Sequence, residues 1–451
     1  SLDNVDITSI TSKRNQTSIT NLDADFSAAD IIADQRQDYD FDTFSQEIRI
    51  SSKNVDSNLD WMLGAYYQQE DINTFRNVTY GTQTYTYSDT LVTLGLSQAI
   101  AAAAIEGYLA AGLPPAGAQA FAEQQVAAAL GPVGGSGLAY VGAAFGVCFV
   151  NGVACTDVFY IPGTGMPSSV WSMDNTAMSV FGQMDYQISD SLTATLGLAY
   201  SDDSKDVSGD ITIIDAFAAL PLEAAGLGAL SGLQFFPAFR NYPNADENGK
   251  FDSDDVTHTL SLSYAMSDST SIYMTHSSGF KATSVNMTVD ARDVRAADPE
   301  DATNIEIGLK TTFDNGYLNL AFFDQNIEGF QSNAFSGTGF NLVNAGKESH
   351  KGVELDSMLA LSENLMLRVS AMSLDAVYDS FEKGTCDTTG LAEPQYQCPA
   401  GQPYVDLSGL NPAGIHDLSA NANIVYSFNL GGALDGFARL EYVYEEDTNL
   451  A

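Results

Sequence analysis

Positive charge is scarce in this sequence of 451 residues. The chain has 18 Lys and Arg against 58 Asp and Glu, which gives a formal net charge of -40 and a pI near 4.1. So few cations cannot assemble a basic patch large enough for a nucleic acid, and they do not favour attachment to anionic lipid headgroups. Disorder is excluded as well, because 21 Tyr and 24 Phe give an aromatic content that disordered chains lack.

Long apolar segments are also lacking. The longest uncharged stretch, 124–156, is interrupted by Pro132 and several glycines. Its densest apolar part, 138–150, has about 13 residues, whereas a membrane-spanning helix needs about 20. The sequence starts at Ser1 without the basic and apolar segments of a signal peptide. We therefore expect neither a spanning helix nor a signal peptide in these residues.

Cysteine and histidine are rare, with four residues of each type. The cysteines form two close pairs, Cys148/Cys155 and Cys386/Cys398, within segments that have the composition of loops. Neither pair has CxxC spacing or a histidine beside it, so we expect two local disulfides in an oxidising compartment and not a zinc site. Four unpaired thiols are the alternative. The histidines lack partners at metal-ligand spacing, and we expect them at ordinary strand or loop positions: His258, His276, His350 and His416.

Motifs of catalytic sites are absent from the sequence. It contains no nucleophile elbow, phosphate-binding loop or dinucleotide fingerprint in a strand-turn-helix context. Two acidic clusters, 202–206 and 252–255, carry the carboxylates that calcium prefers. They lack the glycine-containing twelve-residue loop of a calcium-binding hand, so we expect solvated loop charge, with calcium as the alternative. We expect no enzymatic activity and no resident cofactor.

Alternation of apolar and small polar residues is the dominant pattern. It is clear in 191–200, 256–264 and 418–428, and a period of two residues predicts β-strands. The polar face carries Thr, Ser, Asn and Gly, which suit the wall of a wide lumen better than the wet face of a soluble sandwich. This criterion predicts about thirteen strands. They are expected at 1–11, 41–51, 59–69, 178–187, 191–200, 256–266, 269–277, 303–313, 316–325, 351–361, 364–374, 418–428 and 436–444.

Short and long connections alternate between these strands. Tight turns such as Asp314-Asn315-Gly316 alternate with long excursions. The excursions are 12–40, 70–177, 201–255, 278–302, 326–350 and 375–417. An outer-membrane barrel has this arrangement, with short periplasmic turns and long external loops. The fold class is therefore all-β, a transmembrane antiparallel up-and-down barrel, and the odd strand count predicts an interior piece of a longer barrel.

The two faces of the expected strands have different compositions. Lipid should contact the apolar face: Leu192, Leu196, Leu198, Leu260, Leu262, Ile305, Ile307 and Leu309. The lumen should be lined by Thr257, Thr259, Ser261, Ser263, Asn421 and Asn423. Interfacial girdles are expected at Tyr66, Tyr67, Tyr200, Tyr264, Tyr426 and Phe428, with ordinary strand propensity as the alternative.

Several segments together resemble the barrel of TonB-dependent outer-membrane receptors. They are FSQEIRISS (44–52), LDWMLGAYY (59–67), the strand ending in Gly279-Phe280-Lys281, and the hairpins at 299–310 and 344–355. The resemblance spans the chain outside the long loops, so we expect one partial barrel domain over 1–451. It departs from the family in an Ala/Gly-rich insertion at about 95–155, within the long loop at about 70–177, where 98–106 and 119–130 have helical spacing and predict short helices.

The resemblance implies a barrel of about 22 strands, filled by an N-terminal plug that the TonB complex pulls with energy from the proton gradient. Neither the plug nor the short TonB-binding box can be found in these residues. Lumen charges such as Glu306 and Lys310, or Glu47 and Arg49, would either pair with the plug or line wet space. The implied place is the outer membrane of a Gram-negative bacterium, in contact with its lipid.

The implied function is active transport of a scarce nutrient complex. An iron–siderophore is the family's most frequent cargo, and cobalamin, haem and oligosaccharides use the same barrel. Loop aromatics are candidates for contact with this small-molecule or metal-chelate cargo, with packing of loop against loop as the alternative. These aromatics are Phe235, Phe236, Phe239, Tyr242, Phe330, Phe335 and Phe340. The rival functions are a passive porin-like channel or a structural outer-membrane protein, and a secreted β-sandwich enzyme.

Overall fold

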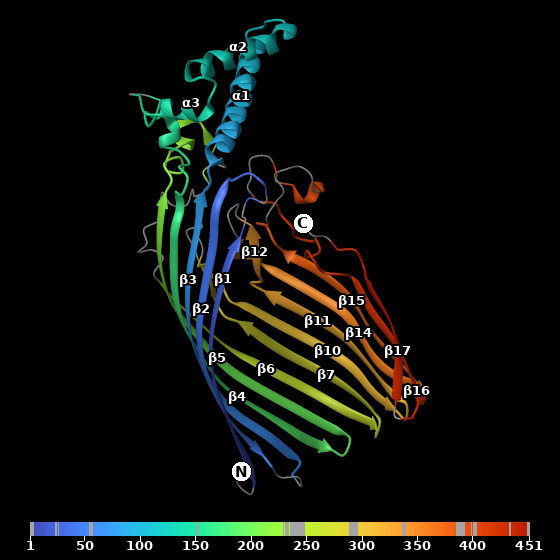
Figure 1. Cartoon of the computed structure of the whole chain (residues 1–451). Coiled ribbons are helices and arrows are strands. Elements are labelled where there is room, and N and C mark those ends of the chain that lie inside the picture. The colour runs from blue at the N-terminus through green and yellow to red at the C-terminus, as the bar shows by residue number, and fades with distance from the viewer. Residues whose placement is uncertain are drawn as a thin grey trace.

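One curved antiparallel sheet of thirteen strands makes up most of the protein (Figure 1). The computed structural model describes residues 4–22, 25, 27–53, 57–149, 152–228, 230, 234, 249–287, 296–335, 340–384, 393–397, 399, 404–432 and 434–448. The strands lie side by side in chain order, each antiparallel to the next. They are β1 (Val5–Leu22), β2 (Ile32–Ser52), β3 (Leu59–Tyr80), β4 (Gly165–Ser189), β5 (Leu192–Ile214), β6 (Gly249–Ser267), β7 (Thr270–Lys281), β10 (Glu300–Phe313), β11 (Gly316–Glu328), β14 (Lys347–Ser362), β15 (Leu365–Ser380), β16 (Leu418–Gly431) and β17 (Leu434–Glu445).

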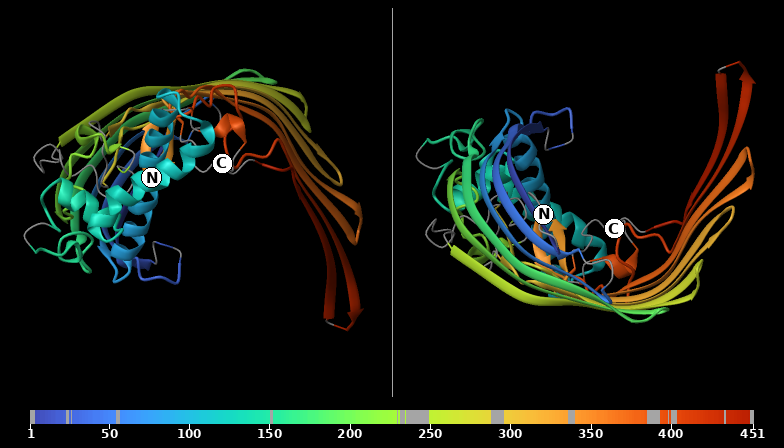
Figure 2. Two further views of the ribbon diagram at one scale, coloured as in Figure 1. Left: turned by 90° about the horizontal axis from the view of Figure 1, so that it is seen from above. Right: turned by 90° about the horizontal axis from the view of Figure 1, so that it is seen from below.

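Smaller elements gather at one end of this sheet. Two short hairpins, β8 (Ser284–Val285) with β9 (Ala296–Ala297) and β12 (Gln331–Phe335) with β13 (Phe340–Asn344), lie in its long connections. Seen along the strands the sheet is an arc, and the helices lie over its concave side (Figure 2). The helices are α1 (Thr84–Ala110), α2 (Ala118–Leu130) and α3 (Gly137–Ala144), with 3-10 turns at Pro115–Gly117, Gly131–Val133, Cys155–Asp157, Glu223–Ala225 and Pro394–Tyr396.

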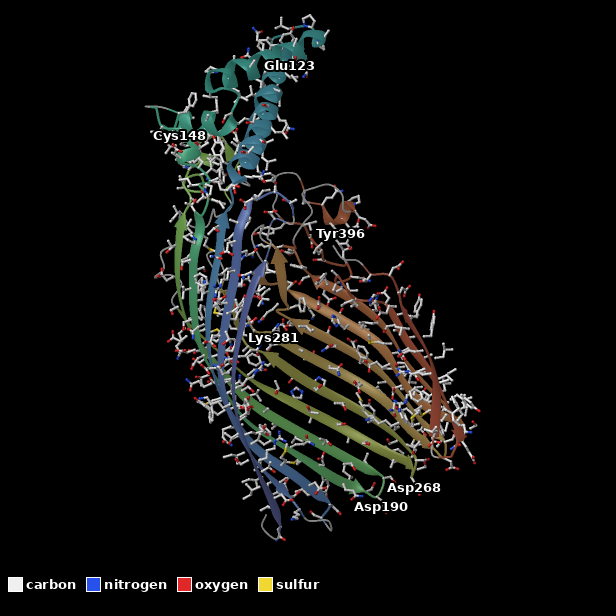
Figure 3. The ribbon with its side chains drawn as sticks, in the orientation of Figure 1. Glu123, Cys148, Asp190, Asp268, Lys281 and Tyr396 are labelled. Carbon is white, nitrogen blue, oxygen red and sulfur yellow. A yellow bond between two sulfur atoms is a disulfide. The ribbon has the colours of Figure 1, made fainter. Side chains whose placement is uncertain are left out.

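All thirteen predicted strands are present, but many continue further than predicted. β5 reaches residue 214 where the alternation ends at 200, and the expected loop 12–40 is mostly strand, since β1 runs to residue 22 and β2 begins at residue 32. Beyond Tyr200 the outward positions of β5 turn polar, as at Asp202 and Asp206, so the hydrogen bonds of the strand continue while the apolar alternation that reveals it is lost. Short turns gather at the end of the sheet that holds Asp190 and Asp268, opposite Cys148 and Glu123 (Figure 3).

The convex face of the sheet is apolar and the concave face is polar. Leu196 pairs with Leu260, and Leu262 with Met274, on the side whose large apolar side chains are exposed. Trp171 and Val207 lie on the opposite side, where they pack against Val285 of the β8–β9 hairpin. This packing identifies the opposite side as the concave one. The register puts all eight leucines and isoleucines predicted to face lipid on the convex side.

The outward position predicted for the girdle aromatics is confirmed only in part, and the girdle itself stays a prediction. Tyr200, Tyr264 and Tyr426 are 45%, 47% and 47% exposed on the convex face. Tyr66 lies on the concave face, across from Glu47, and its hydroxyl donates to Gln68 at 2.6 Å. The assignment of Tyr66 to a girdle was wrong, because the neighbouring Tyr67 takes the outward position and adjacent strand residues face opposite sides.

The border between apolar and charged positions crosses the convex face diagonally. On β5 the first charged outward residue, Asp202, follows Tyr200. On β11 the first, Asp324, follows Phe322, whose rung passes through Ile307, Met274 and Leu262 to Ala194. On β5, Ala194 lies six residues before Tyr200, so the border shifts by about 20 Å along the strands between β5 and β11. The two strands are four inter-strand steps of about 4.8 Å apart. The border is thus inclined at about 45° to the strands, the tilt that strands adopt in membrane barrels.

The helices form a separate apolar crown above the strand ends (Figure 1). Val92 and Leu96 of α1 and Leu138 of α3 are buried with Phe159 and Phe217 in one core. Helices were predicted within 98–106 and 119–130, and both segments are helical. The helical spacing at 98–106 did not reveal the full length of α1, which is long and apolar enough to cross a membrane by length and composition alone. Its contacts with α2 and α3 place it in the crown.

Candidate functional site

A polar cavity of about 490 Å³ lies against the concave wall. Five neighbouring strands, β7, β10, β11, β14 and β15, supply its lining. Polar side chains line most of it, and Phe323, Met372 and Leu374 add apolar patches. The polar side chains of this lining that lie on the concave face are Ser277, Asn304, Glu306, Gln325, His350 and Glu354. A wall of this composition holds water or a polar partner, and it could not face hydrocarbon.

Glu306 and Lys310 of β10 lie on the concave face, as predicted, and the aromatic ring of Tyr273 lies between them. The hydroxyl of Tyr273 donates to Glu306 Oε1 at 2.5 Å, and Lys310 Nζ lies 5.0 Å from the centre of the Tyr273 ring. Tyr273 has room for this position because it pairs across the strands with Gly308. A Cβ on Gly308 would lie 2.3 Å from atoms of the ring.

The second predicted pair of lumen charges, Glu47 and Arg49, also lies on the concave face. Their cross-strand partners on β3 are Tyr66 and Gly64. The guanidinium of Arg49 forms a salt bridge with Glu47 on the same strand. The arginine is 45% exposed, so this pair lines open space and adds little stability.

A buried carboxylate lies one rung above the cavity. Glu348 is 1% exposed, and its Oε2 lies 3.2 Å from Nε2 of His350, which lines the cavity. Its second oxygen, Oε1, has no hydrogen-bond partner among the residues that the structure describes. Tyr378 pairs across from Glu348, and burial together with this carboxylate raises the pKa of Tyr378 to about 12. Tyr378 therefore stays protonated at physiological pH.

Two folded-in connections narrow the mouth above the cavity. Gln331 joins them, because its side-chain amide donates to the carbonyls of Ala282 and Asp298 at 3.1 and 2.9 Å and its carbonyl accepts from Ser284 at 2.7 Å. Asn286 donates to the carbonyl of Leu342 at 2.9 Å and accepts its N–H at 2.7 Å. The hairpins β8–β9 and β12–β13 are thereby fixed to each other.

The structure describes three of the seven aromatic residues that are candidates for cargo contact. Phe330 packs against Ala345, Tyr378 and Phe381 at the mouth, as expected for loop packing. Phe335 and Phe340 form the closing pair of the β12–β13 hairpin. The remaining candidates lie outside the described residues, and the cargo role stays a prediction for the set: Phe235, Phe236, Phe239 and Tyr242.

The two acidic clusters do not lie in loops. They occupy the neighbouring strands β5 and β6, where Asp202 pairs with Asp254 and Ser204 with Asp252. The prediction that these clusters lie in loops was wrong, because β5 and β6 continue as strands above the apolar layer. The same convex rows bring Asp71 and Asp206 beside Asp174, and burial with these two carboxylates raises the pKa of Asp174. Within the described ranges no group of three or more metal-ligating residues is present, and calcium stays a prediction.

The histidines occupy strand and loop positions, as expected, but two of them meet. His258 of β6 and His276 of β7 stack with ring centres 5.0 Å apart on the convex face. The sequence offered no sign of this contact, since it depends on the register of two strands. His350 lies on β14 and His416 in the connection before β16.

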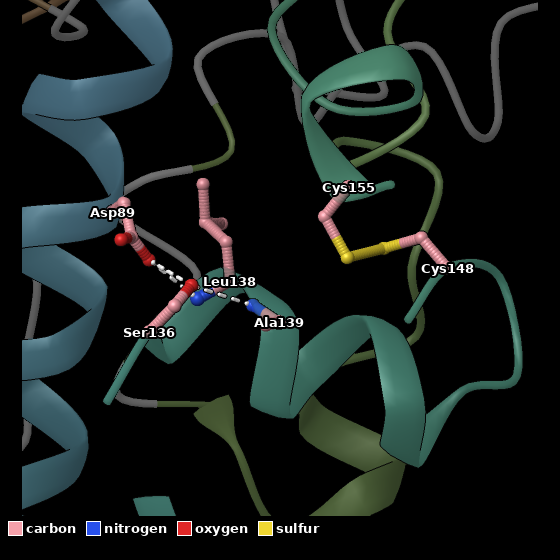
Figure 4. The surroundings of a disulfide bond; sticks show 6 residues. All are labelled: Asp89, Ser136, Leu138, Ala139, Cys148 and Cys155. Carbon is pink, nitrogen blue, oxygen red and sulfur yellow. Dashed lines mark hydrogen bonds between the residues drawn. A yellow bond between two sulfur atoms is a disulfide. The ribbon is translucent and has the colours of Figure 1, made fainter. Parts of the chain in front are cut away.

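One predicted disulfide is present in the crown (Figure 4). Cys148 and Cys155 are bonded, with Cα atoms 5.0 Å apart. Close by, the Ser136 hydroxyl caps α3 by accepting from the Ala139 N–H at 3.0 Å, and donates to Asp89 of α1 at 2.8 Å. Cys386 and Cys398 lie outside the described residues, so their bond stays a prediction.

A tilted antiparallel wall with an apolar convex face, a polar concave face and a narrowed mouth defines a transmembrane β-barrel protein. The chain matches the family described as "TonB dependent receptor-like, beta-barrel" over residues 3–451. It belongs to this family of TonB-dependent receptors, and the resemblance inferred from the sequence is confirmed.

Two solved structures illustrate the likeness of fold. The ferric yersiniabactin uptake receptor FyuA from Yersinia pestis matches with a TM-score of 0.60 at 13% identity, covering 98% of this chain and 47% of that one. The siderophore receptor PiuA from Acinetobacter baumannii matches with a TM-score of 0.53 at 13% identity, covering 94% of this chain and 50% of that one. The chain therefore spans about half the length of these receptors.

Proposed function

We propose that this chain is the barrel wall of an outer-membrane receptor for active transport in a Gram-negative bacterium. The receptor binds a scarce nutrient complex, an iron–siderophore, and admits it to the periplasm with energy from the TonB system. Membership of the receptor family over residues 3–451 is the observation that carries the proposal. The choice of cargo is supported by the shared fold of the ferric yersiniabactin uptake receptor FyuA and the siderophore receptor PiuA.

The concave wall supports the presence of a plug in the whole protein. Its small polar residues, such as Thr259 and Ser261 on β6 and Asn421 on β16, make a wide wet surface that would leak if it were open. A plug held by many hydrogen bonds to such side chains, each worth about 0.5–1.5 kcal/mol, would seal it and still move under force. Glu306 and His350 in the polar cavity are candidate partners for the plug.

Measurement of uptake in living cells tests the proposal. The full-length protein is produced in cells that lack their own siderophore receptors, and radioactive iron is supplied as a panel of iron–siderophore complexes. Accumulation should stop when a protonophore collapses the proton gradient, whereas binding to the cell surface should persist. Surface binding in the same de-energised cells is the control, because it shows that the receptor is still present when uptake stops.

Two results would contradict separate parts of the proposal. Equal uptake with and without the gradient would favour the passive channel. Gradient-dependent uptake of cobalamin, haem or an oligosaccharide, with no uptake of any iron complex, would keep the transport mechanism and reject the siderophore cargo.

A further inference from the structure

Two hairpins at the mouth fold inward over the concave wall. β8–β9 lies in the connection between β7 and β10, and β12–β13 lies in the connection between β11 and β14. The β12–β13 hairpin lies inside the arc of the sheet (Figure 2). We call the described residues of both hairpins the ledge, which comprises 283–287, 296–298, 331–335 and 340–344. Long connections usually run over the outer surface and move freely, so specific contacts must hold the ledge in this inward position.

Gln331 ties the two hairpins together from a buried position. Its side chain is 5% exposed, and every hydrogen-bonding group of the amide is used. The amide donates to the carbonyls of Ala282 and Asp298 and accepts from Ser284. The backbone N–H of Gln331 also donates to Glu300 Oε1 at 2.6 Å. Since a buried polar group is costly to leave unbonded, this network holds β12 in one position.

A second network joins parts of the two hairpins that lie further along the chain. Asn286 is 7% exposed and forms two bonds with the backbone of Leu342 on β13, as donor at 2.9 Å and as acceptor at 2.7 Å. Asn344 accepts the N–H of Asp298 at 2.7 Å and donates to the carbonyl of Gly329 at 2.7 Å. Paired bonds from one side-chain amide fix direction as well as distance, so the two hairpins form one unit.

The ledge is also attached to the wall beneath it. The backbone N–H of Thr283 donates to the Ser253 hydroxyl on β6 at 3.2 Å. Val285 and Met287 pack against the buried cluster that contains Trp171 of β4. Segments that move on binding usually have few buried contacts. Apolar packing at one side and the bonds of the buried amides at the other therefore predict a rigid ledge.

The ledge borders the way from the mouth to the polar cavity. The lining of the cavity reaches Gly279 of β7 and Ala302 of β10. The next inward positions on these strands are Lys281 and Glu300, which pair across the strands and form a salt bridge at 2.9 Å. Gln331 is bonded to this same Glu300, so the ledge begins one inward position above the cavity.

We propose that the ledge is a fixed constriction that limits the size of the iron complex able to reach the concave cavity, and that Gln331 is the residue that positions it. The identity of the cargo rests on the proposed function, whereas the rigidity rests on the hydrogen bonds. The contrasting arrangement is a lid whose hairpins separate to admit cargo. Separation would leave the amides of Gln331 and Asn286 without their partners, which favours the fixed constriction.

Hydrogen exchange of the purified full-length receptor tests the rigidity without any cargo. Gln331→Ala should accelerate exchange in peptides from β12 and β13 by at least roughly 2- to 13-fold, the equivalent of one net hydrogen bond. Gln395→Ala is the matched control, because this glutamine is exposed at the same end of the sheet and donates to Glu393, two residues away. Equal exchange in the two variants would overturn the role of Gln331.

Cross-linking tests whether the ledge must open. The double variant Asn286→Cys with Leu342→Cys places two thiols across the contact between the hairpins, and a short bis-methanethiosulfonate reagent links them. Mass spectrometry confirms the link. The linked receptor should take up its iron complex at the rate of the same double variant without the link. Loss of uptake on linking would overturn the fixed constriction and identify a lid.

Selection by size is measured with an iron–siderophore complex that the receptor accepts and with the same complex enlarged by a coupled fluorophore. Gln331→Ala should raise the uptake of the enlarged complex relative to the parent complex, and Gln395→Ala should leave this ratio as it is in the unaltered protein. An unchanged ratio in Gln331→Ala would overturn the proposed size limit. Circular dichroism of each variant separates these outcomes from a failure to fold.

Failure of the proposed function gives a different pattern. If the unaltered receptor takes up no iron complex, the choice of cargo is wrong, and the hydrogen exchange of Gln331→Ala still decides whether the ledge is rigid. Normal uptake of the parent complex together with equal exchange in both glutamine variants would keep the proposed function and reject the ledge.

Discussion

The hydroxyl of Tyr80, at the end of β3, donates a hydrogen bond of 2.5 Å to the carboxylate of Asp215, which lies 135 residues later, just after β5. Asp215 also accepts the backbone N–H groups of Phe217 and Ala218, both at 3.0 Å. Tyr80 and Phe217 are fully buried in the crown core. One carboxylate therefore joins the ends of two wall strands to the base of the crown.

Loss of the Tyr80 hydroxyl should loosen the crown and leave the barrel wall intact. Tyr80→Phe removes one donor from a buried carboxylate, which costs about 1–3 kcal/mol. Hydrogen exchange of peptides from α3 should accelerate accordingly, while peptides from β10 and β11 stay protected. Tyr87→Phe is the control, because Tyr87 is 44% exposed on α1 and should change nothing. Equal exchange in both variants would show that the Tyr80–Asp215 bond does not hold the crown.

The stability of the crown should fall as the pH rises. Burial raises the pKa of Asp215 above its usual value, although the bonds from Tyr80, Ala218 and Phe217 oppose this shift. The folded crown thus binds the proton more tightly than the unfolded chain does. Its contribution to stability is fully present below the unfolded pKa near 3.8 and is lost as the pH rises through the folded pKa.

Comparison with Asp215→Asn measures this effect. The hydrogen exchange of α3 should be compared in the unaltered protein and the variant at each pH. Between pH 4 and pH 7 the unaltered protein should become less protected relative to the variant, because only Asp215 loses its proton. The comparison at each pH cancels the intrinsic pH dependence of exchange. A constant difference across this range would mean that Asp215 titrates as it does in the unfolded chain.

Strand order and facing were predictable from the sequence, and long-range contacts were not. The alternation in 256–264 identifies β6 and assigns Leu260 to lipid and Thr259 to the lumen, because a strand has only two faces. The alternation stops at the border of the apolar layer, so the polar ends of β5 and β6 were assigned to loops. Contacts such as Tyr80–Asp215 and His258–His276 depend on register between strands, which a single sequence does not encode locally.

Reduction of the Cys148–Cys155 bond should destabilise the crown locally. The loop that it closes is short, with a sequence separation of 7, so the chain-entropy model gives about 2–3 kcal/mol. Mild reductant should therefore expose Phe159 and neighbouring core residues to proteolysis without unfolding the wall. Non-reducing peptide mapping of the untreated protein tests the second expected bond, Cys386–Cys398. Four free thiols, or pairing between the two loops, would contradict both assignments.

Gly308 should not tolerate a methyl group. Gly308→Ala brings a Cβ to within 2.3 Å of the Tyr273 ring, so the ring must move and its bond to Glu306 must break. Overpacking of this kind costs about 1–3 kcal/mol. Gly279→Ala is the matched control on the same wall, because its Cβ would meet the Ala302 methyl at an ordinary 3.8 Å. Urea titration of the barrel in lipid vesicles should separate the two variants, and equal midpoints would contradict the close packing of Tyr273 on Gly308.

Substitution by arginine should cost more stability on the convex face of the wall than on the concave face. Leu196 lies on the convex face, one rung position from Thr259 in the register of β5 with β6, and Thr259 lies on the concave face. Leu196→Arg places a charge in hydrocarbon and should cost roughly 2–4 kcal/mol near the middle of the bilayer. Thr259→Arg places the same charge in the wet interior and should cost little. Urea titration in lipid vesicles gives both free energies of unfolding. If Thr259→Arg were the more damaging substitution, the assignment of faces would be reversed, and with it the direction from which lipid and cargo meet this wall.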